Sequence, residues 1–289
     1  MMRVDPRIHL PEAVNGEDFD YVRGLVRDHT AIALDSTKVY LVNARLLPVA
    51  RNAGFQSVVA LIKHLRSQTP GELHIKTVEA IVTTETSFFR DFFPFEALRQ
   101  EVIPEIMVER RGTSRSLTIW SAGCSSGQEP YSLAMMLREA FPELTTWNTR
   151  ILASDVSNGM LEKSKAATYS QTEVNRGLPA PMLVKYFRQN GTTWKLDNEI
   201  RNMVSFFHHN LARDQPALPP VDILSMRNVL IYFDVATKRL VLDRIRRYLR
   251  PGGLLILGTA ETTLNLDERF ERVRLGRAVF YRAMKTEAR

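Results

Sequence analysis

Apolar residues in the first part of the chain recur at every third or fourth position, which is the spacing of helices with one buried face. The stretches with this spacing are 18–26, 39–53, 57–67 and 75–82. Turn residues separate them, at Gly54 and at 69–71. We find no strand pattern before residue 117. This part of the sequence therefore predicts a small all-helical domain over residues 1–84.

After residue 112 the pattern changes to short apolar runs that alternate with helical stretches. Runs typical of buried strands cover 117–120, 149–155, 202–211, 221–228 and, after a turn at 251–253, 254–258; closing strands follow at 272–273 and 278–281. This alternation predicts an α/β fold with a doubly wound, mostly parallel sheet over residues 113–289. Residues 165–209 interrupt it with helical and hairpin parts that turn at 189–191, which predicts a small inserted β-subdomain.

A glycine-rich loop at 121–127 separates the first predicted strand from a helix. Its glycines allow a ligand to approach the backbone, and the helix start offers unpaired N–H groups, so a nucleotide-like ligand fits. The spacing matches neither the dinucleotide nor the triphosphate fingerprint. Glu129 near the helix start would repel a phosphate and suits the ribose, amine and sulfonium of S-adenosylmethionine. In the alternative interpretation, Glu129 only complements the helix dipole.

Polar residues also follow two other predicted strands. Asp155 ends the second strand, one βα unit after the glycine loop, where a carboxylate typically binds ribose hydroxyls. The alternative is that Asp155 is the N-cap of the next helix, beside Ser157. Arg227 and Asn228 end the buried strand at 221–228. Ligands of open sheets bind at this carboxyl edge.

Residues 85–112 join the two predicted domains. Two aromatic pairs, a run of hydroxyl residues and Arg90 precede a helix expected over 96–111. In one interpretation the aromatic residues only pin a connection into the core. In the other, the segment closes over the cofactor and Arg90 meets a carboxylate.

The composition narrows the class of protein. The net charge of +7 favours anionic partners, and residues 22–70 are rich in arginine and lysine; an ordinary solvated helix face is the alternative. No apolar run approaches the ~20 residues that span a bilayer. The start of the chain lacks the apolar core of a secretion signal. The single cysteine, Cys124, excludes an internal disulfide and a multi-cysteine zinc site, so we expect a cytoplasmic protein. His208 and His209 are adjacent on a predicted strand and point to opposite faces, so we expect no metal site.

Several of these stretches together resemble the class I S-adenosylmethionine-dependent methyltransferases and, within them, the chemotaxis receptor methyltransferase family called CheR. The resemblance rests on Phe-Phe-Arg-Asp at 88–91, Gly-Cys-Ser-Ser-Gly-Gln-Glu-Pro-Tyr-Ser at 123–132, Ala-Ser-Asp at 153–155, His-Asn-Leu at 209–211 and Arg-Asn-Val-Leu-Ile-Tyr-Phe-Asp at 227–234. The second stretch is highly specific. With the helical N-terminal domain and the inserted subdomain, the resemblance covers nearly the whole chain.

The resemblance implies a set of functional residues. The family's cofactor contacts correspond to Thr86, Arg90, Glu129, Asp155, Asn210, Leu211, Arg227 and Asn228. Thr84 stands where the family commonly has asparagine, so that contact is a departure from the family's pattern. Tyr232 matches a tyrosine beside the transferred methyl, or is a core aromatic. Arg99 is a candidate for the arginine near it, but its alignment is weak.

The implied reaction is methyl transfer from S-adenosylmethionine to a glutamate side chain of a chemoreceptor. A carboxylate with a reference pKa of about 4.3 is already ionised at neutral pH, so no catalytic base is needed. We expect the basic helices within 22–70 to meet the receptor's cytoplasmic domain, with no membrane insertion and a monomeric enzyme. The motif for base methylation is absent, which disfavours nucleic acid as substrate, and Cys124 lacks a basic partner for nucleophilic catalysis. Methylation of another protein or a small molecule, and a non-catalytic module that senses the cofactor, are the alternatives.

Overall fold

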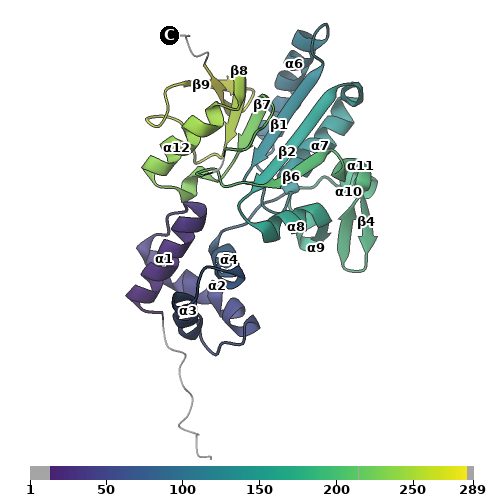
Figure 1. Cartoon of the computed structure of the whole chain (residues 1–289). Helices are drawn as coiled ribbons and strands as arrows, with labels where there is room; N and C mark the ends of the chain where they lie inside the picture. The colour runs from purple at the N-terminus through teal and green to yellow at the C-terminus, as the bar shows by residue number, and fades with distance from the viewer. Residues whose placement is uncertain (1–13, 214, 285–289) are drawn as a thin grey trace, which may run out of the picture. The chain divides into compact units, whose positions relative to one another are not determined.

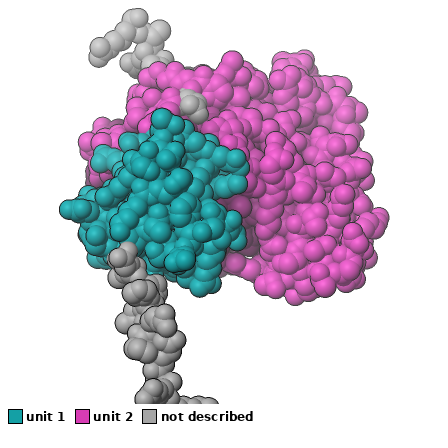
Figure 2. Space-filling model, turned by 60° about the horizontal axis from the view of Figure 1, so that its bottom comes forward, with its two compact units in different colours: residues 1–83 teal, residues 84–289 magenta. Residues whose placement is uncertain are grey.

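The computed structural model describes residues 14–213 and 215–284. They separate into a unit that ends at Thr83 and a unit that begins at Thr84 (Figure 2). Residues 1–13 and 285–289, which the sequence analysis assigned to the two domains, lie outside the described residues.

The first unit is all-helical, as predicted. Its helices are α1 (Gly16–Thr30), the short η1 (Ser36–Lys38), α2 (Val39–Asn52), α3 (Val58–Ser67) and α4 (Glu72–Ile81). Side chains cap the starts of α1, η1 and α3: Asn15 accepts from the Asp18 N–H at 2.8 Å, Asp35 from the Thr37 N–H at 2.8 Å, and Ser57 from the Ala60 N–H at 3.1 Å. Fully buried apolar side chains from the helices form its core, among them Val22, Leu46, Leu61 and Ile62.

The second unit is built on a seven-stranded sheet (Figure 1). Its strands are β1 (Ser116–Ala122), β2 (Asn148–Asp155), β6 (Val204–His208), β7 (Val221–Met226), β8 (Leu249–Leu257), β9 (Phe270–Leu275) and β10 (Ala278–Ala283), in the order β6-β2-β1-β7-β8-β10-β9. The first five in this order are parallel, and β10 is antiparallel to both its neighbours. The predicted doubly wound, mostly parallel sheet is confirmed. Because the strand order reverses beside β1, the loops after β1 and β7 flank the position where such sheets bind ligands.

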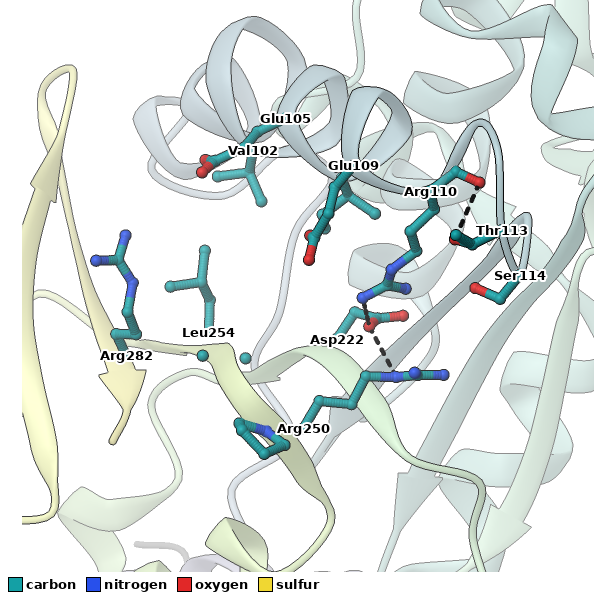
Figure 3. A pocket seen from close by; sticks show the side chains of 14 residues that line it. Val102, Glu105, Glu109, Arg110, Thr113, Ser114, Asp222, Arg250, Leu254 and Arg282 are labelled. Carbon is teal, nitrogen blue, oxygen red and sulfur yellow. Dashed lines mark hydrogen bonds and ion pairs between the residues drawn. The ribbon is translucent and has the colours of Figure 1, made fainter. Parts of the chain in front are cut away.

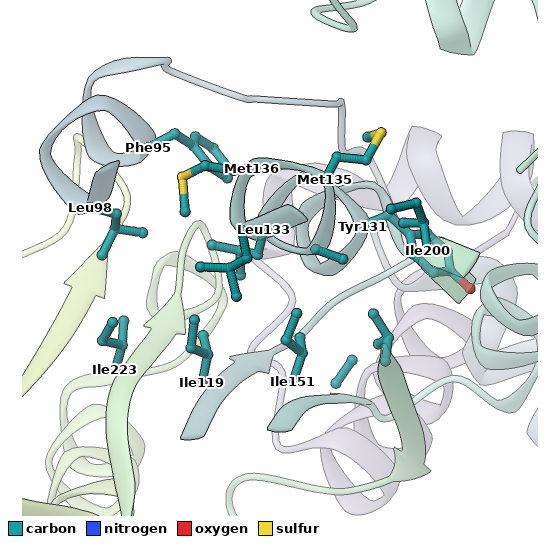
Figure 4. Close-up of a cluster of buried hydrophobic side chains, with 14 of the residues drawn as sticks. Phe95, Leu98, Ile119, Tyr131, Leu133, Met135, Met136, Ile151, Ile200 and Ile223 are labelled. Carbon is teal, nitrogen blue, oxygen red and sulfur yellow. The ribbon is translucent and has the colours of Figure 1, made fainter. Parts of the chain in front are cut away.

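Helices cover both faces of the sheet. Apart from two helices of the insert described below, the helices of this unit are α5 (Phe93–Ala97), the π-helical η2 (Leu98–Val102), α6 (Ile103–Arg110), α7 (Gln128–Ala140), η3 (Pro142–Thr146), α8 (Asn158–Ala166), α11 (Asn198–Arg201), η4 (Leu230–Tyr232) and α12 (Val235–Arg246). Leu133 and Met136 of α7 lie over Ile119, Ile151 and Ile223 of three neighbouring strands (Figure 4). On the opposite face, the Trp120 ring contacts Tyr248, just after α12, with the ring centroids 5.3 Å apart.

Two boundaries differ from the sequence-based expectation. The helix expected from residue 96 begins at Phe93, because Pro94 is favoured in a first helical turn. The turn expected at 251–253 lies inside β8, where the pairing with β7 shifts register between Val221 and Ile223. Gly252 has φ +83° there, so the irregularity is a bulge within the strand.

The insert predicted over 165–209 contains a three-stranded antiparallel sheet. Its elements are β3 (Thr168–Ser170), α9 (Gln171–Asn175), α10 (Ala180–Tyr186), β4 (Phe187–Asn190) and β5 (Thr193–Leu196), with the strands in the order β3-β5-β4. Gly191, with φ +60°, lies in the tight turn between β4 and β5. The rings of Tyr169 and Phe187 are fully buried against Phe88, which joins this subdomain to the segment that precedes α5.

An ion-pair cluster ties together the amino-terminal edge of the sheet (Figure 3). The Asp222 carboxylate accepts from Arg110 Nη2 at 2.6 Å and from the Thr118 N–H at 2.7 Å, and Arg250 Nε lies 3.1 Å away. These residues come from β7, α6, β1 and β8. Asp222, Arg110 and Arg250 line a cavity of about 710 Å³ that the Arg282 and Glu109 side chains also border. The Asp222 side chain is only 2% exposed, so this cluster is a buried anchor of the sheet.

Candidate functional site

Asp155 lies at the carboxyl end of β2 and connects that strand to the glycine loop. Its carboxylate accepts from the backbone N–H of Ser125 at 2.7 Å and of Ser157 at 2.9 Å. The N-cap of α8 is Ser157, whose Oγ accepts from the Met160 N–H, so the interpretation of Asp155 as that cap is wrong. Burial raises the pKa of Asp155, and the backbone hydrogen bonds counteract it. A buried carboxylate held by neutral donors has lone pairs available for the hydroxyl groups of a ligand.

Glu129 and Arg227 form a second buried cluster, beside the start of α7. The Glu129 carboxylate accepts from Ser121 Oγ at 2.7 Å and from Arg227 Nη1 at 3.1 Å. Arg227 Nη2 donates to Asp91 Oδ2 and to the Arg90 carbonyl, each at 2.6 Å. The Arg227 side chain is 3% exposed. Glu129 thus does more than complement a helix dipole: it belongs to a charge network between β1, β7 and the segment before α5.

Two buried polar atoms in this region have no hydrogen-bond partner among the described residues. They are Nε of Arg227 and Oδ1 of Asn228. Asn228 has φ +59°, in the left-handed region, which directs the chain sharply away from β7. Unsatisfied buried groups are costly, so a polar ligand that supplied both a donor and an acceptor here would be stabilised.

The segment from Thr84 to Phe92 is held against the glycine loop and α7. Ser125 Oγ donates to the Thr84 carbonyl at 2.6 Å, and the Phe89 N–H donates to Ser132 Oγ at 3.0 Å. Phe89, Asp91 and Phe92 have φ values of +45°, +62° and +43°. Each such conformation costs roughly 1–3 kcal/mol in a residue with a side chain, and strain of this kind clusters at ligand sites. Phe88 is pinned in the core, whereas the Phe92 side chain is 58% exposed.

The inserted subdomain also contacts this segment at Gly177, between α9 and α10. Arg176 forms an ion pair with Glu85 at 2.8 Å. A Cβ added to Gly177, which has φ +83°, would lie 2.1 Å from the Phe88 carbonyl oxygen. No side chain fits there, so the position of Phe88 depends on a glycine in the subdomain.

We expect Gly177→Ala to destabilise the protein by about 2–4 kcal/mol, because it adds a backbone clash to left-handed strain. It should also lower the affinity for S-adenosylhomocysteine at least about tenfold, since Phe88 is two residues from a carbonyl that binds Arg227. Urea unfolding and calorimetry measure the two effects. Gly191→Ala is the matched control, because Gly191 has φ +60° with nothing within 4 Å of an added Cβ. Equal effects of the two substitutions would contradict the role of the Gly177 contact.

The other predicted cofactor residues lie at the same carboxyl edge. Asn210 and Leu211 follow β6 and are buried. The N–H of the preceding residue, His209, donates to the Asp155 carbonyl at 3.0 Å, which brings this stretch next to Asp155. Thr84 and Thr86 are half-buried in the segment before α5. Tyr232 is half-buried at the end of η4. The structure therefore brings together residues from five separate stretches of the sequence.

The two predicted arginines outside the strands differ in their surroundings. Arg90 is half-buried, and its Nη1 donates to the Glu85 carbonyl at 3.3 Å. Arg99 is exposed on the π-helical turn η2, and within the described part of the chain no hydrogen bond or ion pair joins it to the other predicted site residues. The role of Arg99 stays a prediction.

Sequence reasoning missed two acidic residues of the site. Asp91 pairs with Arg227, and only its place directly after Arg90 offered a signal. Glu261, 8% exposed, accepts from the N–H groups of Gly258 at 2.7 Å, Asn228 at 2.8 Å and Ile231 at 3.2 Å. Glu261 thereby holds the turn that ends at Tyr232, and nothing in its local sequence indicated that contact.

Other chemistry is disfavoured by the surroundings of the residues that suggested it. Cys124 is 2% exposed, and burial raises the pKa of its thiol well above the ordinary value, so it is a poor nucleophile. Within residues 14–213 and 215–284, no cluster of three or more histidine, cysteine, aspartate or glutamate side chains is arranged to hold a metal ion. No helix in the described chain is long and apolar enough to cross a membrane.

The sequence matches two domain profiles of one family and is similar to several named proteins. The profile described as "CheR methyltransferase, SAM binding domain" matches residues 84–279, and "CheR methyltransferase, all-alpha domain" matches residues 17–76. The chain is 38% identical over 271 residues to chemotaxis protein methyltransferase 1 of Pseudomonas aeruginosa. This alignment covers 92% of the present chain and 97% of the relative. The chain is also 36% identical over 271 residues to chemotaxis protein methyltransferase Cher2 of Pseudomonas putida. That alignment covers 92% of the present chain and 98% of the relative.

The match to the SAM-binding profile begins at Thr84, where the second unit begins, and covers all the residues of the site described above. S-adenosylmethionine carries ribose hydroxyls and an amine, which suit the carboxylates of Asp155 and Glu129, and its other polar groups offer acceptors that would suit the unsatisfied Arg227 Nε. The chain therefore belongs to the CheR methyltransferase family, and its second unit is a methyltransferase domain that binds S-adenosylmethionine.

Proposed function

We propose that the protein methylates glutamate side chains on the cytoplasmic domains of chemoreceptors, giving glutamate 5-O-methyl esters for sensory adaptation. The observation that carries the proposal is the similarity over more than nine-tenths of the chain to proteins named chemotaxis protein methyltransferases. Such an acceptor places the enzyme in the cytoplasm, and we propose that it acts as a monomer.

The residues present define how each part of the cofactor would be held. Asp155, whose buried carboxylate accepts from the backbone N–H groups of Ser125 and Ser157, would accept from the ribose hydroxyls. Glu129 would accept from the amine, and Arg90 with Thr84 and Thr86 would border the carboxylate. Asn210 and Leu211, beside the Asp155 carbonyl, would border the adenine. Arg227 Nε and Asn228 Oδ1, which have no partner among the described residues, would hydrogen-bond to further polar groups of the cofactor.

The reaction needs alignment more than acid or base chemistry. A carboxylate oxygen of the acceptor forms a bond to the methyl carbon as the bond from that carbon to sulfur breaks, and no proton moves. An anion and a sulfonium become two less charged products, so a dry site that aligns the reactants supplies the rate. Tyr232, at the end of a turn fixed by Glu261, would shape this site and hydrogen-bond the acceptor. Arg99 remains the candidate for a second contact to the acceptor.

The test is transfer from radiolabelled S-adenosylmethionine to receptor cytoplasmic fragments, with and without their C-terminal tails. We expect label that is released by mild base, as esters are. The short turn between β4 and β5 leads us to expect no need for a tail. Cofactor binding without transfer to any receptor would contradict the proposal and favour a cofactor-sensing module, whereas transfer to another protein or a small molecule would indicate a different acceptor.

The basic helices of the first unit are proposed to steer the enzyme onto an acidic receptor surface. Arg23, Arg51 and Lys63 are exposed. We expect their joint reversal to glutamate to slow receptor methylation about tenfold at low salt, with cofactor affinity within twofold, because charge complementarity acts mainly on association. Rates at low and high salt, with calorimetry for the cofactor, measure this.

The matched control for this triple variant is reversal of Arg111, Arg115 and Arg150, which are exposed residues of the second unit beside the amino-terminal ends of β1 and β2. It should leave the methylation rate nearly unchanged. Equal slowing by both triple variants, or equal loss of rate and cofactor affinity in the first, would refute steering by these helices.

A further inference from the structure

A groove of the second unit lies beside the proposed methyl-transfer site. One wall is the strained segment that contains Asp91 and Phe93, and the other is the β9–β10 hairpin with Val279 and Tyr281. Its volume is about 510 Å³, within the usual range for ligand sites. None of the residues assigned to the cofactor lines this groove, so cofactor binding does not account for it.

Two acidic residues connect this groove to the site. Asp91 lines it and forms the 2.6 Å ion pair with Arg227. Glu261 also lines it, and its carboxylate accepts from the N–H groups of Asn228 and Ile231, in the turn that ends at Tyr232. The groove and the methyl-transfer site therefore share a wall.

The charges that remain available in the groove are positive. Asp91 is paired with Arg227, and the Glu261 carboxylate already accepts from three backbone N–H groups. Arg272 and Arg277 are exposed, and among the residues described neither has a carboxylate within 4 Å. Arg277 lies over the Phe93 ring, 4.1 Å from its centroid, which holds the guanidinium at the groove.

The register of the hairpin directs the second arginine to the same place. Arg272 of β9 pairs with Tyr281 of β10, so the two side chains share one face of the sheet. Both line the groove. Two guanidinium groups without acidic partners, from different parts of one hairpin, make a site that suits a carboxylate.

We propose that this groove binds an acidic segment of the acceptor protein, and that Arg272 and Arg277 bind a carboxylate next to the glutamate that is methylated. The inference rests on the proposed function. On a helical acceptor, side chains three or four residues apart are neighbours, so one glutamate can enter the methyl-transfer site while an adjacent acid meets the arginines. The groove then selects glutamates that have an acidic neighbour on the same helix face.

The test compares two double variants of the full chain on a receptor cytoplasmic fragment. We expect R272E/R277E to raise KM for the fragment at least about tenfold, because the acceptor's acid meets like charges. The kcat of this variant should stay within about threefold of the wild-type value, and its affinity for S-adenosylhomocysteine should stay within about twofold of the wild-type affinity. The control R111E/R115E makes the same charge change beside the start of β1 and should leave KM unchanged. Arg277→Gln, which adds no repulsion, should raise KM less.

A reciprocal change in the fragment tests the contact itself. Replacing the acids next to the acceptor glutamate by glutamine should raise KM for the wild-type enzyme, while the R272E/R277E enzyme should be insensitive to it or favoured by it.

Three results would overturn the inference. The first is an unchanged KM in R272E/R277E, and the second is the same loss in the control. The third is a fall in cofactor affinity that matches the rise in KM, which would show that Arg277 only holds the segment around Phe93. If the wild-type enzyme transfers no methyl to any receptor fragment, the proposed function fails and this inference with it. If the wild type is active and the variants are normal, the inference alone fails.

Discussion

Replacing Asp155 by alanine should lower the affinity for S-adenosylmethionine at least about 100-fold. Asp155 is 8% exposed at the end of β2, and its carboxylate accepts hydrogen bonds from two backbone N–H groups. Two ribose hydroxyls bonded to a charged acceptor contribute roughly 1.5–3 kcal/mol each, and 1.4 kcal/mol corresponds to a factor of ten. The loss should be the greater because the Ser125 N–H, which holds the glycine loop, also loses its acceptor. Isothermal calorimetry with cofactor and product measures it.

Asp155→Asn keeps one oxygen acceptor and should lose affinity to an intermediate degree. Asp197→Ala is the matched control, because Asp197 also precedes a helix, α11, but lies in the inserted subdomain. Circular dichroism would establish that each variant is folded. Unchanged affinity of a folded Asp155→Ala variant would refute the assignment of this residue to the ribose.

Replacing Asp222 by alanine should lower the free energy of unfolding of the second unit by about 3–5 kcal/mol. Its side chain is 2% exposed and interacts with Arg110, Arg250 and the Thr118 N–H. Removing one partner of a buried ion pair leaves the other charge without compensation, which costs much more than the net value of the pair. The three tryptophans, Trp120, Trp147 and Trp194, all lie in the second unit, so their fluorescence during urea unfolding reports on it.

Asp243 offers a matched control for the effect of burial. It also pairs with two arginines, Arg247 at 2.6 Å and Arg269 at 2.9 Å, but its side chain is 30% exposed. Exposed ion pairs contribute about 0–1 kcal/mol, so Asp243→Ala should destabilise the protein by no more than that. A loss for Asp222→Ala as small as that for Asp243→Ala would show that water compensates the two arginines at the cavity of Figure 3.

The charge network around Arg227 connects the cofactor site to the segment before α5. Its partners are Glu129 after β1 and Asp91 before α5. Burying a guanidinium that is only 3% exposed is costly without such partners, so the segment before α5 must be in place for the site to form. The same segment is fixed by Gly177 from the inserted subdomain. Changes in the subdomain should therefore reach the cofactor site.

The local sequence pattern was sufficient to predict a feature when all of its residues lay in one helix or strand and the loops beside it. The spacing of the apolar residues predicted the helical unit and the strands of the sheet, because a helix or strand has apolar residues wherever its side chains are buried. The glycine loop and Asp155 could be recognised as a site because strand, loop and helix are consecutive in the chain. The helix start at Phe93 was missed although Pro94 signalled it.

What the sequence alone determined was the alternation of elements, the loop after β1 and the strand ends that carry Asp155, Arg227 and Asn228. Only the tertiary structure decided which groups meet. Asp222 and Arg110 are 112 positions apart, and Arg227 and Asp91 are 136 apart. Such contacts depend on the order of strands in the sheet and on the path of the segment before α5. Each residue's own neighbours in the sequence carry no information about that order, because a carboxylate at a strand end can pair with whichever cation the fold brings there.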